Sequence, residues 1–182
     1  MAPPSKPLKT QVLEAAVARL LAINPSTDSN YHAKFDVVKV QEPPSVQYLR
    51  HSGNEVPSSV NRAGFVWHSE NTHAVRDSGR NQATLQMVVT AMQRYPWDDR
   101  NPFVDQPAGF KPRQEVLGEM ESDLERAFED VRLGGVSVFA RPIESRIPSV
   151  ATTYNAEWPW LELDFLFEVV FKYVRSQPWT TA

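Results

Sequence analysis

The feature that most constrains the fold lies near the end of the chain, where residues 158–174 read WPWLELDFLFEVVFKYV. Seven apolar side chains occupy the odd positions from Leu161 to Tyr173. The even positions are mostly charged: Glu162, Asp164, Glu168 and Lys172. Because successive side chains of a strand point to opposite faces, this alternation predicts one long β-strand with an apolar face and a mostly charged face.

The length of this strand raises the question of what pairs with it. Thirteen residues extend about 43 Å at about 3.3 Å per residue, well above the usual length of a strand. One interpretation is a hairpin partner within the chain, drawn from residues 64–95. Another is a strand of a neighbouring subunit, because unpaired strand edges readily add strands. The two interpretations are compatible with each other.

Two segments have the period of amphipathic helices. Residues 10–23 carry apolar residues at spacings of three and four, with Thr10 as the expected N-cap and Asn24-Pro25 as the stop. Residues 113–131 carry a second apolar stripe, with acidic residues toward the positive N-terminal end of the helix. We therefore expect one helix near the start of the chain and one in its second half.

Four more segments are expected to be strands: 31–42, 64–70, 83–95 and 136–145. They are rich in β-branched and aromatic residues and are separated by polar or proline-rich stretches. A turn is expected around Asp77-Ser78-Gly79, between the second and third of them. Pro142 restricts the last of them to a sheet edge or a bulge, because proline has no N–H for the ladder.

The order of these elements favours a single α+β domain. Strands and helices do not alternate regularly, so a doubly wound parallel sheet is not expected. We predict a mostly antiparallel sheet with two helices packed on one face and the long C-terminal strand as its main apolar seam. Residues 1–8 are expected to form a mobile N-terminal arm, residues 9–182 the domain, and residues 43–80 a polar excursion from it.

Composition narrows the class of protein. The chain has 182 residues, of which 41% are hydrophobic and 23% charged, as is typical of a soluble globular domain. It has no cysteine, which excludes disulfides, thiolate metal ligands and cysteine nucleophiles. The formal net charge of −3 argues against a protein that wraps nucleic acid. No apolar run approaches the roughly 18 residues needed to cross a bilayer, so no membrane partner is expected.

No sequence pattern points to catalysis. His68, Glu70 and His73 are close in sequence, but their spacing fits no strong metal signature. Three aspartates of a proline-rich loop lack the spacing of a calcium loop: Asp98, Asp99 and Asp105. Nucleophile elbows, phosphate-binding glycine loops and dinucleotide fingerprints are absent. We therefore expect no enzyme activity, and no catalytic, cofactor-binding or metal-binding residues.

Tryptophans and arginines in loops are the better candidates for contact with a partner. Tryptophan is enriched at interaction hot spots, and two loop tryptophans are the stronger candidates: Trp97 and Trp158. Arginines of the polar excursion are candidates for contact with an acidic partner or with nucleic acid, and a solvated loop is an equal alternative for them. These are Arg50, Arg62, Arg76 and Arg80.

Residues 121–145, ESDLERAFEDVRLGGVSVFARPIES, describe a helix that ends at Leu-Gly-Gly and leads into a strand. A linker follows, and then the alternating final strand, which ends in FEVVFKYV. With the short helix and strand of the N-terminal half, this order resembles the tail terminator (minor tail) proteins of long-tailed bacteriophages. The residue pattern resembles the family over residues 121–174, and the layout over most of the chain. The excursion at 43–80 and the loop at 96–112 are longer than in the family.

This resemblance implies a structural function in the virion. Members of the family form hexameric rings that cap the finished tail tube, stop its polymerisation and present a surface to the head connector. The implied partners are other copies of the chain, the tail tube protein and the head–tail connector proteins. The implied location is the head-proximal end of the tail, after assembly in the host cytoplasm. The implied fold is a mixed sheet with helices against it, without catalytic residues or cofactors.

A ring at this position surrounds passing DNA without binding it sequence-specifically. A mildly acidic lumen avoids holding a polyanion, and the even face of the final strand is the candidate lining, with a solvent-facing sheet surface as the alternative. The lining residues are Glu162, Asp164 and Glu168. Two other functions stay open. One is another head–tail connector or tail-completion protein, and the other is a small α+β ligand-binding protein or enzyme.

Overall fold

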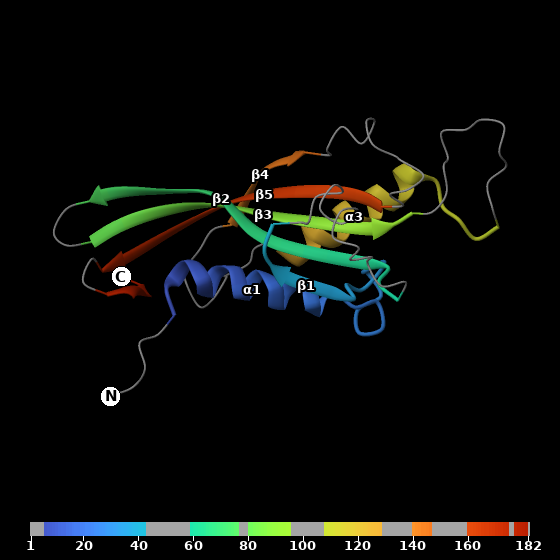
Figure 1. Cartoon of the computed structure of the whole chain (residues 1–182), viewed down its shortest axis with the longest axis horizontal. Helices are drawn as coiled ribbons and strands as arrows, with labels where there is room; N and C mark the ends of the chain where they lie inside the picture. The colour runs from blue at the N-terminus through green and yellow to red at the C-terminus, as the bar shows by residue number, and fades with distance from the viewer. Residues whose placement is uncertain are drawn as a thin grey trace, which may run out of the picture.

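The computed structural model describes seven stretches of the chain: residues 6–42, 59–76, 80–95, 108–128, 140–146, 160–174 and 177–181. Its helices are α1 (Leu8–Ala22) and α3 (Arg113–Phe128). Its strands are β1 (Val37–Val40), β2 (Arg62–Arg76), β3 (Arg80–Arg94), β4 (Ala140–Arg146), β5 (Trp160–Val174) and β6 (Gln177–Thr181). Figure 1 shows these elements as one elongated sheet with helices beside it.

The strands form one mixed sheet. Its order is β1-β2-β3-β5-β4, and β6 pairs with β5 on the same side as β4. Only β1–β2 is parallel among the described pairs, and the other four are antiparallel. The predicted α+β class with a mostly antiparallel sheet is therefore confirmed.

β5 is the central seam of this sheet. It pairs with β3 without interruption, from Arg94↔Trp160 to Arg80↔Val174. Its odd-position side chains are buried wherever they are described: Leu161, Leu163, Phe165 and Val169. The long strand was thus predicted correctly, and its main partner belongs to the hairpin at 64–95. Pairing with a second subunit stays a prediction.

The helices and the inward side chains of the strands share one core. α1 contributes Val12, Ala16 and Leu20, and α3 contributes Met120 and Leu124. They meet buried side chains from β2, β3 and β5: Val66, Leu85, Met87, Val89, Ala91, Leu161, Leu163, Phe165 and Val169. A fully buried side chain of this size stabilises the fold by about 1.5–3 kcal/mol, so this layer makes a large contribution to stability.

The other face of the sheet carries a smaller cluster. Its buried members are Val60, Ala63, Phe65, Met92 and Trp160. Trp160 shares the even face of β5 with Glu162 and Asp164, which are half-buried. The even face was expected to be mostly charged, and near Trp160 it is instead partly apolar and covered.

β4 behaves as its proline requires. It is the last strand of the sheet beyond β5. The register with β5 shifts between Pro142 and Glu144, which marks a bulge. Both alternatives that the proline left open, an edge and a bulge, are therefore confirmed together.

The first helix starts earlier than predicted. α1 begins at Leu8 behind Pro7, and the N-cap makes no side-chain hydrogen bond. Proline fixes φ near the helical value, so it can start a helix without a hydroxyl cap. Thr10 therefore lies inside the helix, and its prediction as the N-cap is wrong. The helix ends at Ala22, before Asn24, as expected.

Three strand boundaries also differ from the prediction. Of the strand expected at 31–42, only Val37–Val40 forms, because residues 32–36 supply polar contacts to α3 and β2. β2 and β3 extend beyond the strands expected at 64–70 and 83–95, and they leave only residues 77–79 between them. Residues 62–76 of the expected polar excursion are therefore strand.

The hairpin of β2 and β3 extends beyond the helices. Figure 1 shows the paired ends of β2 and β3 reaching past the start of α1, with β6 at the same end of the molecule. We call residues 72–76, 80–84 and 170–174 together with β6 the projecting end, and the remaining described elements the body. Within the described residues, neither helix has the length and apolarity of a membrane span.

Candidate functional site: a buried network around Asp123

The best-defined polar site joins β2 to the middle of α3. Asp123 is 1% exposed and Arg62 is 2% exposed. Arg62 Nη1 donates to Asp123 Oδ2 at 2.5 Å. An ion pair this deeply buried persists only when the other hydrogen-bonding groups of both side chains are satisfied.

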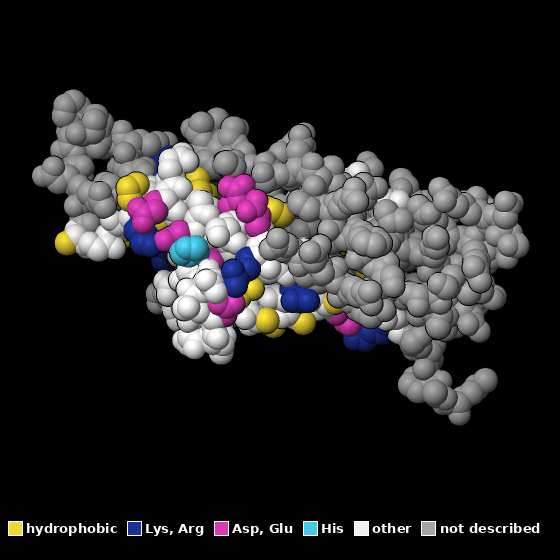
Figure 2. All heavy atoms as spheres, turned by 180° about the vertical axis from the view of Figure 1, so that it is seen from behind, with side chains coloured by type: hydrophobic (Ala, Val, Ile, Leu, Met, Phe, Trp, Pro, Cys, Tyr) yellow, Lys and Arg dark blue, Asp and Glu magenta, His cyan; other side chains and the backbone are white. Residues whose placement is uncertain are grey.

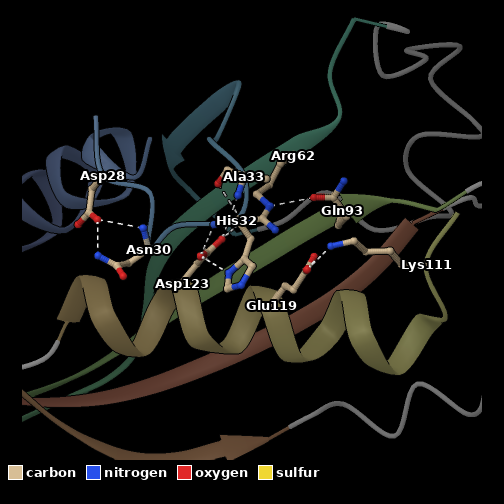
Figure 3. A network of polar contacts seen from close by, with 9 residues as sticks. All are labelled: Asp28, Asn30, His32, Ala33, Arg62, Gln93, Lys111, Glu119 and Asp123. Carbon is tan, nitrogen blue, oxygen red and sulfur yellow. Dashed lines mark hydrogen bonds and ion pairs between the residues drawn. The ribbon is translucent and has the colours of Figure 1, made fainter. Parts of the chain in front are cut away.

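The loop before β1 satisfies the rest of the Asp123 carboxylate. The backbone N–H groups of His32 and Ala33 donate to its two oxygens, at 2.9 and 3.3 Å. His32 Nδ1 lies 2.9 Å from Oδ1. Because an ionised carboxylate only accepts, Nδ1 carries a proton in this contact. Figure 3 shows these groups converging on the helix.

Arg62 is held on its other sides as well. Its Nε donates to Gln93 Oε1 at 2.8 Å, and its Nη1 donates to the carbonyl of Ala33 at 3.0 Å. The guanidinium also lies 5.5 Å from the centre of the Phe35 ring, a cation–π distance. One side chain therefore connects the first residue of β2 to β3, to the loop and to α3.

Asp36 continues the network to the start of β2. Its Oδ2 accepts the backbone N–H groups of Asn61 and Arg62, at 2.8 and 3.2 Å. Its own N–H donates to the carbonyl of Arg62 at 2.9 Å. These bonds explain why residues before Val37 do not join the sheet as a longer β1.

Exposed charged side chains make contacts at the two ends of α3. Asn30, mainly through its backbone N–H, lowers the pKa of Asp28, and Arg126 contributes a smaller effect. At the other end, the hydrogen bond that Lys111 Nζ donates to Glu119 raises the pKa of Lys111. Both groups are solvated, so each contributes little energy.

The network is suited to fixing the helix rather than to chemistry. Asp123 and Arg62 have protein partners for their charged groups and are sealed from water. His32, with 38% of its side chain exposed, and the exposed Asp36 are members that a solute can reach. In the described stretches, no three histidine or acidic residues gather in an arrangement that could hold a metal ion.

Arg62 is the candidate interface residue whose placement differs most from expectation. It was placed in a polar loop, but it begins β2 and is buried beneath α3. It does not present a surface to a partner, because its charge is needed to balance that of Asp123. Its prediction as an interface residue is therefore wrong.

The other predicted residues are distributed over the molecule. Arg76 and Arg80 face each other in register at the turn of the β2–β3 hairpin. Asp164 accepts the hydroxyl of Thr90 at 2.6 Å, and that hydroxyl accepts Trp67 Nε1 at 3.2 Å. Several candidates lie outside the described residues: Arg50, Trp97, Asp98, Asp99, Asp105 and Trp158. The side chains of Glu70, His73 and Glu168 are likewise outside the description, and a register shift separates His68 from Glu70.

Sequence reasoning missed Asp123 and His32, although the sequence does contain a signal for Asp123. It stands three residues after Met120 and four before Ala127, on the apolar stripe of the helix. A carboxylate on such a stripe indicates a buried acid that needs a cationic partner. Nothing in the local sequence marks His32 as one of its contacts.

No protein-family model matches the chain, and a search of curated proteins finds no significant relative.

Proposed function

We propose that the chain is a ring-forming structural protein that caps a phage tail tube, ends tube polymerisation and joins the tail to the head connector. The α+β class and the mixed sheet agree with the fold that the resemblance implies. The resemblance also includes a Leu-Gly-Gly stop, at Leu133-Gly134-Gly135, which lies outside the described residues. The closing strand on which the resemblance rests is β5.

The observation that carries this proposal is the projecting end. A ring built by head-to-tail contacts needs two different complementary surfaces on each subunit. The ladder of β2, β3 and β5 continues to Arg76, Arg80 and Val174, at the end of the molecule that reaches past the start of α1 (Figure 1). Strands that extend past the helix beside them are suited to contact a neighbouring copy.

The body supports the same function in a different way. A cap must keep one shape while it contacts the tube on one side and the connector on the other. The contacts of Asp123 with Arg62, His32 and Ala33 fix α3 and the loop at residues 31–36 onto the sheet. The proposed partners are other copies, the tail tube protein and the head–tail connector proteins, in the virion.

Charge favours passage of DNA over its retention. The face in Figure 2 shows acidic and basic side chains mixed over the described part of the surface. A surface that holds DNA tightly gathers lysine and arginine instead. An acidic lumen lining by Glu162, Asp164 and Glu168 remains a proposal. Its test is charge reversal of Glu162 and Glu168 to lysine, which should impede DNA passage while rings still form.

The proposed function is tested by imaging the protein with and without tail tubes. We expect closed rings, hexamers by the resemblance, at one end of each tube, and tubes that no longer elongate once capped. A monomer at every concentration that never joins a tube would contradict the proposal. A ring found elsewhere in the neck of purified particles would favour another connector or tail-completion protein.

A further inference from the structure

Among the described strands, the two outer edges of the projecting end have no partner, and they are complementary to each other. β1 pairs with β2 only from Ala63 to Val66, so no described strand pairs with the outer side of β2 beyond Val66. On the opposite side of the sheet, the outer side of β6 also has no described strand partner. Unpaired strand edges carry rows of N–H and C=O groups that readily pair with another chain.

The register places these two edges at the same level. One row crosses the whole sheet: Arg76 pairs with Arg80, Arg80 with Val174, and Val174 with Gln177. β2 stands at one end of this row and β6 at the other. β6 lies near α1.

Strand directions make the two edges compatible between copies. Each step from β2 through β3 and β5 to β6 is antiparallel, so β6 runs opposite to β2. If a second copy stands beside the first in the same orientation, its β6 meets β2 as an antiparallel strand. The same step repeated gives a head-to-tail array, which closes into a ring when the rotation allows it.

We propose that β2 of one copy pairs edge to edge with β6 of the next copy, so that the sheet continues from subunit to subunit. This seam rests on the proposed ring, and it specifies which strands join the copies. The occupant is a second copy, because the same chain supplies a strand of opposite direction at the matching level.

The backbone groups that form the seam follow from strand geometry. Arg62 donates its N–H to Asp36 and accepts from Asp36 with its C=O, so its backbone groups point away from β3. Alternate residues repeat this direction, and the register shift between His68 and Glu70 adds one residue. The residues whose N–H and C=O groups face the open edge are then Asn71, His73 and Val75.

A proline at one of these positions tests the seam. His73→Pro removes an N–H from the open edge while β2 keeps its bonds to β3, and His73→Ala is the matched control that keeps the N–H. Sedimentation of the folded proteins should show rings for the wild type and His73→Ala. For His73→Pro, we expect the dissociation constant of the ring to rise at least about tenfold, because the bond is lost at every seam.

The outcomes separate the seam from the ring. If His73→Pro forms rings as tightly as the wild type, the seam is wrong while the proposed ring stands. If the wild type forms no ring, alone or on tail tubes, both are wrong. If His73→Pro does not fold, chemical cross-linking decides instead.

The cross-linking variant uses the absence of native cysteine. Arg76→Cys and Gln177→Cys in one chain lie three strand spacings apart, about 14 Å, which is too far for an internal disulfide. With a short bismaleimide, the double variant should give a ladder of covalent multimers. Each single variant should stay monomeric, because equivalent cysteines of neighbouring copies lie the width of a subunit's sheet apart. Linked or unlinked monomers alone from the double variant would overturn the seam.

Discussion

The body and the projecting end differ in the contacts that the structure describes. In the body, two helices cover the buried core of the sheet, and an ion pair between Arg62 and Asp123 fixes the layers. In the projecting end, backbone pairings join β2, β3, β5 and β6. The buried side chains of the body stabilise the subunit, and we propose that the projecting end supplies backbone groups for assembly.

The buried ion pair matters to this comparison because of its position more than its energy. Desolvation of two charges offsets most of their attraction, so such a pair adds little net stability. Its geometry, however, selects one placement of α3 and of the loop at residues 31–36. In the proposed ring, a body with one shape would let a backbone edge meet the next copy in register.

The largest expected effect is the loss of Asp123. Asp123→Ala leaves Arg62 buried without its carboxylate and removes the acceptor of two backbone N–H groups. We expect the free energy of unfolding to fall by about 3–5 kcal/mol, measured by urea denaturation. The control Glu125→Ala, on the exposed face of the same helix, should change it by less than about 0.5 kcal/mol.

A double variant sharpens this prediction. Replacing Asp123 with leucine and Arg62 with methionine together removes both charges, and should recover much of the loss seen in Asp123→Ala. If Asp123→Ala itself costs less than about 1 kcal/mol, the network does not fix α3, since an uncompensated buried charge costs more than that.

Replacing two glycines of the body with alanine should change the free energy of unfolding in opposite directions. A Cβ at Gly64 would lie 3.1 Å from a ring carbon of Phe35 and 3.2 Å from Leu20, so Gly64→Ala should destabilise by about 1–3 kcal/mol. A Cβ at Gly118 would meet nothing within 4 Å, so Gly118→Ala in α3 should stabilise by about 0.8–1.0 kcal/mol. Thermal unfolding measures both. Equal effects would mean that the strand and the helix are not as closely packed at Gly64 as described.

Proline substitutions in β2 test which backbone N–H groups of the projecting end face the open edge. The strand geometry directs the N–H of Thr72 toward β3 and that of His73 toward the open edge. Thr72→Pro should therefore cost at least about 1 kcal/mol more than His73→Pro in the free energy of unfolding of the unassembled chain. Equal losses, measured by denaturation at low protein concentration, would place the bulge or the alternation elsewhere.

The smallest expected effect is the acid dependence contributed by Asp28. Its pKa is lowered in the folded chain, chiefly by the N–H of Asn30. A lowered pKa means that the contribution is present above the pKa of the unfolded chain and is lost as the pH falls through the folded value. The stability difference between the wild type and Asp28→Ala should therefore shrink between neutral pH and pH 3. A difference that grows on acidification would contradict the assigned contacts.

Local sequence patterns predicted the elements that follow from the properties of a single chain segment. The alternation from Leu161 to Phe165, the stripe of α3 and the restriction at Pro142 each follow from one chain segment. They were predicted because burial of one face and the lack of a proline N–H are local properties.

Long-range contacts account for the elements and site residues that were missed. β1 is short because Asp36 and the loop before it bond to Arg62 and Asp123, which are distant in sequence. Its parallel pairing with β2 is likewise set by the fold. The burial of Arg62 could not be predicted without knowing that Asp123 lies opposite, although the position of Asp123 on the apolar stripe was a usable signal.

The most direct test of the central claim is hydrogen exchange of the backbone amides in the free and the assembled protein. We predict that the N–H groups of Val66 and Val89 are protected in both states, and that those of His73 and Val75 become protected only on assembly. Protection of His73 and Val75 that is the same in both states would contradict the claim that a neighbouring copy completes the projecting end.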